Sequence, residues 1–168
     1  METLGAKLPA YAKIIRLMPN MAMTVGKGVC LLSANPNVTE EEKAHIMSIL
    51  GVMGLVKEIP EHLMDAGSAL CGCSPAFTDL YMEAMADGAV ACGIPRAKAL
   101  KYAAAAVAGA ARLALETGEH PGALKDKVCS PGGSTIQGVR ALENRAFRGA
   151  VMEAVIAAAG ASGDLGKK

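Results

Sequence analysis

The sequence predicts a mainly helical protein in which a short β-containing segment precedes the helices. Alanine accounts for 32 of the 168 residues, whereas aromatic residues make up 3% and Trp is absent. Alanine is the best helix former and aromatic residues are enriched in strands, so this composition favours closely packed helices over a β-sandwich. Hydrophobic residues make up 52% and charged residues 20%, which is enough apolar material to form a buried core.

Three short apolar runs in the first part of the chain predict strands. Residues 13–18 should form the first strand, which stops at Pro19, and residues 28–34 the second. Residues 55–59 predict the third. So few strands make an incomplete sheet, and we interpret them as the last part of a larger one.

One helix is predicted between the second and third strands. Thr39 can serve as its N-cap, and Glu42, three residues further on, completes a capping box. The helix should run to about Leu50, with Gly51 just past its end, because glycine commonly follows a helix C-terminus. The predicted order of this part of the chain is therefore β-β-α-β.

The rest of the chain predicts helices only. Ser74 followed by Pro75 has the pattern of an N-cap and a first helical residue. Gly93 and Gly118 are expected to follow the ends of two long helices. The predicted helices are 74–92, 95–117, 134–143 and 147–161.

The predicted helix over residues 95–117 contains a stretch without any charged side chain, residues 102–111. A helix that is apolar on all sides is usually buried on all sides. A chain of this length has difficulty burying such a helix alone, so a second subunit should surround it. We therefore expect an obligate dimer formed through the helices of residues 74–117.

Charge and composition exclude several other classes. The net charge is +1 and no basic block occurs, so we expect no nucleic-acid partner. The charge-free stretch is too short to cross a bilayer, so we expect no membrane partner. The five cysteines are odd in number and irregularly spaced, and Glu2 and Pro9 interrupt the place where a signal peptide would be apolar. These features predict a cytoplasmic protein without a disulfide framework.

The segment that indicates chemistry most clearly is SPGGST, residues 130–135, which opens a predicted helix. Backbone N–H groups at a helix N-terminus, together with the helix dipole, bind a carboxylate or a phosphate. Glycine allows a ligand to approach the backbone closely. The alternative interpretation is a Ser-Pro-Gly-Gly turn followed by an ordinary helix cap.

The stretch SPGGSTIQGVRALENRAF, residues 130–147, closely resembles the signature region of pyrroline-5-carboxylate reductases. Those enzymes perform the last step of proline synthesis. Other segments agree in the family's order, and the resemblance covers about residues 13–161. These segments are RLMPN (16–20), LMDA (63–66), GCSPAF (72–77), GEHP (118–121) and LKD (124–126).

The resemblance implies a mainly α fold: a helical dimerisation domain, similar to the C-terminal domain of 6-phosphogluconate dehydrogenase, preceded by a β-β-α-β remnant of a Rossmann domain. The composition shift near residue 60 is the one candidate boundary. It assigns residues 1–60 to the remnant and residues 61–168 to the helical dimerisation and substrate-binding domain. The family's dinucleotide fingerprint, G-x-G-x-x-G after a strand, does not occur in this sequence. The chain therefore resembles a C-terminal portion of these enzymes, and we expect it to be inactive alone.

The resemblance also implies a reaction, the reduction of 1-pyrroline-5-carboxylate to L-proline with NADPH or NADH, in a homodimer or a higher homo-oligomer of dimers. No metal is required. The Ser130 side chain and the N–H groups of Gly133, Ser134 and Thr135 would hold the substrate carboxylate. The Thr135 hydroxyl, the implied catalytic group, would face the ring nitrogen. The implied substrate-binding residues are Ser130, Gly132, Gly133, Ser134 and Thr135. The implied cofactor-binding residues are Pro19, Asn20, Gly72, Cys73 and Ser74.

The sequence departs from the family pattern at several positions. Arg145 and Ala146 replace paired glycines, which would either fuse two helices or move the break to Asn144. Cys71 and Cys73 stand where the family usually has serine; they are substituted serines or a metal or redox pair.

Two alternatives to an active reductase stay open from the sequence. One is a truncated, non-catalytic dimerisation module, because the dinucleotide fingerprint is absent. The other is a related imine reductase with an altered substrate, which the two cysteines favour. His120, before Pro121, is either a capping or solvated histidine or a catalytic one.

Overall fold

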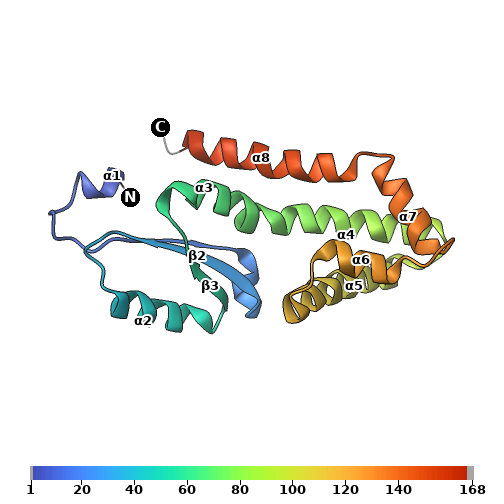
Figure 1. Ribbon diagram of the computed structural model, residues 1–168, viewed down its shortest axis with the longest axis horizontal. Coiled ribbons are helices and arrows are strands. Elements are labelled where there is room, and N and C mark those ends of the chain that lie inside the picture. Colours follow the sequence, from blue (N-terminus) through green and yellow to red (C-terminus); the bar gives the residue numbers. More distant parts are fainter. Residues whose placement is uncertain (1, 166–168) are drawn as a thin grey trace. The chain divides into compact units, whose positions relative to one another are not determined.

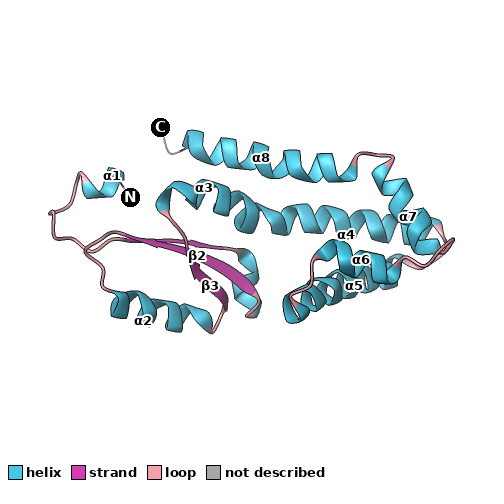
Figure 2. Ribbon diagram, in the orientation of Figure 1, coloured by secondary structure: helices cyan, strands magenta, loops and turns pink. Residues whose placement is uncertain are grey.

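The computed structural model describes residues 2–165 and confirms the mainly α class (Figures 1 and 2). These residues group into two compact units. The first combines the chain up to Ala76 with the residues from Glu153 on, and the second is Phe77–Met152. The elements are α1 (Glu2–Gly5), β1 (Ile15–Pro19), η1 (Met21–Val25, 3-10), β2 (Gly28–Ala34), α2 (Glu40–Gly51), β3 (Gly54–Glu58), η2 (Glu61–Leu63, 3-10), α3 (Met64–Gly67), η3 (Ser68–Cys73, a π-helix), α4 (Ser74–Ala91), α5 (Arg96–Thr117), α6 (Pro121–Val128), α7 (Ser134–Glu143) and α8 (Phe147–Leu165).

The three predicted strands form one sheet in the order β1-β2-β3 (Figure 2). β1 is antiparallel and β3 is parallel to β2. β2 has the predicted bounds, and its Cys30, Leu31 and Leu32 are buried in the core of the first unit. β3 begins and ends one residue before the predicted strand.

β1 begins two residues later than predicted and ends one residue later, at Pro19. The Asn20 N–H donates to the carbonyl of Val29, and the Asn35 N–H donates to that of Ile14, both at 3.0 Å. Alternate residues of an antiparallel strand bond to the partner strand, so the backbone N–H and C=O groups of the even-numbered residues of β1 point toward β2. The missing N–H of Pro19 therefore removes no bond between β1 and β2, and the strand can continue through it.

The capping box predicted for α2 is present, but the predicted end of that helix is wrong. Thr39 Oγ1 accepts from the Glu42 N–H at 3.2 Å, and Glu42 Oε2 accepts from the Thr39 N–H at 3.0 Å. Gly51 is the last residue of α2 rather than the residue after it. The positive φ of +143° occurs at Gly54, where a Cβ would lie 2.1 Å from the carbonyl oxygen of Gly28. Glycine is thus required where two strands approach each other, not at the helix end.

α4 begins at Ser74, as predicted, but the N-cap role predicted for Ser74 is wrong. α3, η3 and α4 follow one another without a break. Ser74 has helical angles (φ −55°, ψ −32°), and its Oγ donates back to the carbonyl of Leu70 instead of capping. The helical run starts earlier because its first turns pack on the sheet. Ala69 is fully buried, and a Cβ on Gly67 would lie 2.4 Å from Leu31 Cδ1.

The second unit has a small core built from alanines. Ala86 of α4 and Ala99 and Ala103 of α5 are buried, and methionines and a valine of α4 pack around them. As predicted, Gly93 and Gly118 follow the two long helices, with φ of +95° and +65°. Small side chains let α4 and α5 approach closely, but they bury little apolar area within one chain.

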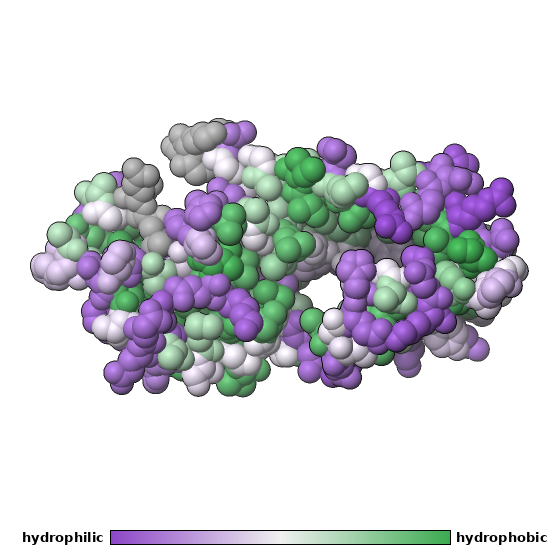
Figure 3. Space-filling model, viewed as in Figure 1, coloured by the Kyte–Doolittle hydropathy of each residue, from purple (hydrophilic) through white to green (hydrophobic). Residues whose placement is uncertain are grey.

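α5 leaves most of its apolar side chains exposed in the single chain. Within residues 102–111 only Ala103 is buried. Tyr102 is 57% exposed and Leu115 79%. Figure 3 shows apolar residues, in green, at the surface of the molecule. The chain alone therefore does not bury the helix for which the sequence predicts burial on all sides.

The helices of the last part of the chain differ from the prediction in two respects. α6 was not predicted; His120 is its N-cap, and His120 Nδ1 accepts from the Gly122 N–H at 3.0 Å. The capping interpretation of His120 is thereby confirmed. α7 and α8 are not fused, since a break at residues 144–146 separates them and Ala146 has a φ of +54°. α8 also continues past residue 161.

Candidate functional site

Residues 130–133 form a tight turn that leads into α7. The Gly133 N–H donates to the Ser130 carbonyl at 3.0 Å, and Gly132 at the third position has a φ of +71°. Proline at the second position and glycine with positive φ at the third are the signature of a type II turn. α7 then begins at Ser134, as predicted.

The N-terminus of α7 is open to a ligand. Gly133 is its N-cap, with extended angles and no side-chain cap. No described residue bonds to the side chains of Ser134 and Thr135. A Cβ on Gly133 would lie 2.3 Å from Ser130 Oγ, so the serine hydroxyl lies directly over the glycine. The Gly133 N–H is used within the turn, so the free donors are the N–H groups of Ser134, Thr135 and Ile136.

Two cationic side chains of the same unit are paired with carboxylates. Lys125 of α6 forms an ion pair with Asp126, and this hydrogen bond raises the pKa of the Lys125 ammonium. Arg148 of α8 contacts Glu143 at 2.6 Å. Attraction for an anion at this site therefore comes mainly from the backbone N–H groups and the dipole of α7.

The second set of predicted residues lies in the first unit, at the end of β1. Asn20 Nδ2 donates to the Cys71 carbonyl at 3.0 Å, and Asn20 Oδ1 accepts from the Val29 N–H at 3.0 Å. A Cβ on Gly72 would lie 3.2 Å from Met18 Sδ. The structure thus brings the strand end and residues 71–73 together, although residues 72–74 are helical rather than a loop.

The two cysteines of this region are half-buried and carry free thiols. Burial raises the pKa of the Cys71 thiol, which keeps it protonated near neutral pH. Among residues 2–165, no three His, Cys, Asp or Glu side chains gather as a metal site would require.

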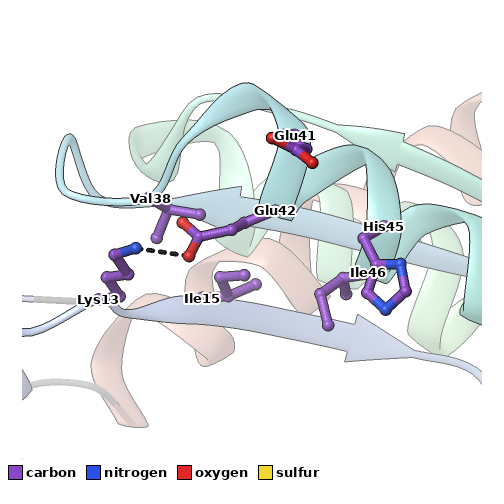
Figure 4. Close-up of a pocket in the computed structure, with 7 residues that line it drawn as sticks. All are labelled: Lys13, Ile15, Val38, Glu41, Glu42, His45 and Ile46. Atoms are coloured by element: carbon purple, nitrogen blue, oxygen red, sulfur yellow. Dashed lines mark hydrogen bonds and ion pairs between the residues drawn. The ribbon is translucent and has the colours of Figure 1, made fainter.

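One hollow of the first unit coincides with neither set of residues. It has a volume of about 550 Å³ between β1 and α2, with an apolar floor of Ile15, Val38 and Ile46 (Figure 4). Glu42, on its rim, pairs with Lys13, and that lysine lowers the pKa of Glu42 to about 2. The remaining rim residues are Glu41 and His45. Because Lys13 neutralises Glu42, Glu41 leaves the rim with a net negative charge, which disfavours an anionic substrate there.

The sequence did not predict the contact between Asn20 and the helical run of α3, η3 and α4. The one local indication of it is Pro75, which cannot donate a helical N–H bond.

No helix among the described residues has the length and apolarity needed to cross a bilayer.

Three comparisons with known proteins agree with one another. The family model described as "Pyrroline-5-carboxylate reductase dimerisation" matches residues 61–165. A relative named pyrroline-5-carboxylate reductase, from Synechocystis, is 50% identical over 155 residues, which are 92% of this chain and 58% of the relative. The chain therefore spans little more than half of that relative's length.

Two solved structures resemble this one over nearly the whole chain. A pyrroline-5-carboxylate reductase from Coxiella burnetii has a TM-score of 0.93 and 33% identity, covering 98% of this chain and 61% of its own. A Plasmodium falciparum pyrroline carboxylate reductase with NADP bound has a TM-score of 0.89 and 31% identity, covering 96% and 65%.

Proposed function

The chain belongs to the pyrroline-5-carboxylate reductase family, and we propose that it forms the substrate-binding and dimerisation part of an enzyme that reduces 1-pyrroline-5-carboxylate to L-proline. In this proposal residues 61–168 are the helical dimerisation and substrate-binding domain, and residues 1–60 are the end of the dinucleotide-binding domain. The start of the family match at residue 61 supports that division. The five free cysteines are consistent with a cytoplasmic enzyme.

The observation that carries the proposal is the turn and open helix start at residues 130–135. The substrate is a small cyclic imine with one carboxylate. We assign that carboxylate to the Ser130 hydroxyl and to the N–H groups of Ser134 and Thr135, which lie at the positive end of α7. The two glycines leave the backbone accessible. Binding there would orient the substrate, and orientation is the main task of a protein whose cofactor carries the chemistry.

Thr135 is the residue to which we assign the catalytic role. Its hydroxyl has no hydrogen-bond partner among the described residues, so it can bond to the substrate's ring nitrogen. As the C=N bond is reduced, that nitrogen gains electron density and takes up a proton. A hydroxyl beside it would position the nitrogen and stabilise the developing charge.

The residues present fit the nicotinamide end of a dinucleotide, whose chemistry when bound is to supply the hydride. Gly72 lies beside Met18 near the end of β1, and Asn20, which follows Pro19, is bonded to the carbonyl of the neighbouring Cys71. No phosphate-binding G-x-G-x-x-G occurs in the 168 residues. The relative with NADP bound favours NADPH for this enzyme, with NADH as the alternative.

The proposal is tested by restoring the dinucleotide-binding part. We expect no NADPH oxidation with 1-pyrroline-5-carboxylate by the chain alone, and turnover once the dinucleotide-binding part of the Synechocystis relative is fused to it. In that fusion, Thr135→Ala should lower kcat about tenfold to a hundredfold, the equivalent of roughly 1.5–3 kcal/mol, with a smaller change in KM.

Two outcomes would favour other functions. A folded, dimeric fusion that shows no turnover would indicate a non-catalytic dimerisation module, in keeping with the missing fingerprint. A fusion that reduces other cyclic imines faster than 1-pyrroline-5-carboxylate would indicate a related imine reductase, in which Cys71 and Cys73 replace the usual serines.

A further inference from the structure

We propose that Asn20 is a positioning residue: its side-chain amide holds the π-helical turn η3 against the end of β1. It would act on the nicotinamide through that turn rather than by touching the ring. This inference rests on the proposed function, because it concerns residues assigned above to the cofactor side.

The need for Asn20 arises from Pro75, which lies inside a continuous helical run. In an α-helix the N–H of residue 75 would donate to the Cys71 carbonyl, and in a π-helix to the Leu70 carbonyl, to which Ser74 Oγ donates here. Proline has no N–H, so neither carbonyl receives a bond from residue 75. Asn20 Nδ2 donates to the Cys71 carbonyl at 3.0 Å and replaces the missing bond. The π-helical turn lies directly before this interruption of the α-helical bonding pattern.

The Asn20 amide is fixed from its other side as well. Its Oδ1 accepts from the Val29 N–H at 3.0 Å, and its backbone N–H donates to the Val29 carbonyl at 3.0 Å. Its own carbonyl accepts from the Met23 N–H at 3.2 Å. With Oδ1 bound to β2, Nδ2 has to face η3. The side chain therefore bridges two elements that are far apart in the sequence.

The bridge sets how close the turn lies to the strand. A Cβ on Gly72 would lie 3.2 Å from Met18 Sδ, so little space separates η3 from β1 there. Loss of the Asn20 donor would leave the half-buried Cys71 carbonyl without its partner and allow η3 to move.

Hydrogen–deuterium exchange of the full chain tests the inference. Asn20→Asp keeps the acceptor for Val29 and removes the donor to Cys71. Asn37→Asp is the matched control, because it removes the amide donor to the carbonyls of Ala10 and Ala12 in the same unit. In Asn20→Asp the amides of residues 68–76 should exchange about threefold to tenfold faster than in the parent. In Asn37→Asp their exchange should equal that of the parent.

The same measurement on the parent and both variants in the fused enzyme, with and without NADPH, separates this inference from the proposed function. NADPH should slow exchange of residues 68–76 in the parent and in the control, and a higher NADPH concentration should be needed in Asn20→Asp. Equal exchange in Asn20→Asp and the parent would overturn the role of Asn20. If exchange is faster in Asn20→Asp but the NADPH concentration needed for protection is unchanged, Asn20 has a structural role only and the positioning role is overturned. If exchange is faster in Asn20→Asp but NADPH protects residues 68–76 in none of the three proteins, the Asn20 bridge is supported and the proposed cofactor site is contradicted.

A measurement on the unmodified chain covers the case in which Asn20→Asp fails to fold. A nuclear Overhauser effect should connect the Asn20 side-chain amide protons to the Hα of Cys71 or Gly72. Its presence supports the bridge, and its absence overturns it.

Discussion

Two adjacent glycines in the turn before α7 are required for different reasons. Gly132 has open space around it, but its φ of +71° is one that L-residues rarely adopt. Gly133 has ordinary angles, but a Cβ there would lie 2.3 Å from Ser130 Oγ and 3.2 Å from the Ser130 carbonyl. The first glycine is needed for the shape of the turn, and the second keeps the Ser130 hydroxyl over the helix start.

Substitution of each glycine by alanine should therefore give different results in the fused enzyme. Gly133→Ala displaces the Ser130 hydroxyl, so KM for 1-pyrroline-5-carboxylate should rise about tenfold, the effect of one lost hydrogen bond to a charged group. Gly132→Ala should lower the free energy of unfolding by about 1–2 kcal/mol through its strained φ. Steady-state kinetics and chemical denaturation of both variants measure these effects. If both variants match the parent, the turn is an ordinary helix cap.

Ala146 is the one described non-glycine residue with a positive φ, at +54°. It stands where the family commonly has glycine, so Ala146→Gly should relieve strain between α7 and α8. The left-handed conformation costs alanine about 1–2 kcal/mol, and the added freedom of glycine in the unfolded chain offsets about 0.4–1 kcal/mol. We expect a net gain of about 0.5–1 kcal/mol in the free energy of unfolding, measured by denaturation. The control Ala150→Gly, inside α8, should instead lose about 1 kcal/mol.

The start of α2 couples a helix cap to an ion pair, which makes its stability depend on pH. Glu42 accepts from Lys13 and from the Thr39 N–H, and these bonds lower the pKa of its carboxyl from 4.5 to about 2. Because the folded-state pKa is depressed, the contribution to stability is complete above about pH 4.5 and is lost as the pH falls toward 2. Glu42 is exposed to solvent, so salt should weaken the effect.

Thermal melts measured across that pH range test the coupling. The Tm of the parent should fall more steeply with decreasing pH than the Tm of Glu42→Gln, and the two should converge at the acidic end. Glu41→Gln, which changes a neighbouring carboxylate in the same helical turn, should retain the slope of the parent. Equal slopes for the parent and Glu42→Gln would show that the pair contributes nothing to folding.

The whole molecule exposes more apolar surface than a stable monomer should. The second unit buries three alanines, whereas Tyr102, Leu113 and Leu115 of α5 are each at least 50% exposed. Exposed apolar surface of this extent is typical of an interface. The family model that matches residues 61–165 is described as a dimerisation model. We expect two copies to associate through α4 and α5.

Sedimentation velocity at micromolar concentration should therefore show a dimer without monomer. Tyr102→Glu places a charge in the expected interface and should shift the population toward monomer or unfolded chain. Lys101→Glu, next to it, changes charge without removing apolar surface and should stay dimeric. A folded, monodisperse parent monomer would contradict the expected interface.

Elements whose signals lie within a few residues of one another could be predicted from the sequence. The capping box of α2, the glycines after α4 and α5, and the turn that starts α7 at Ser134 all depend on local hydrogen bonds or local backbone angles. The family resemblance rests on the same kind of local pattern, above all residues 130–147, and the comparisons bear it out. The strands were located to within two residues because apolar runs bounded by proline and glycine define them locally.

Features that depend on contacts between distant residues could not be predicted in this way. Ser74 is not an N-cap, because packing of Gly67 and Ala69 on the sheet makes the earlier turns helical. The partner of the Cys71 carbonyl is Asn20, 51 residues away in the sequence. A proline in a helix shows from the sequence that a carbonyl loses its donor, but which side chain replaces that donor depends on how the chain folds back on itself.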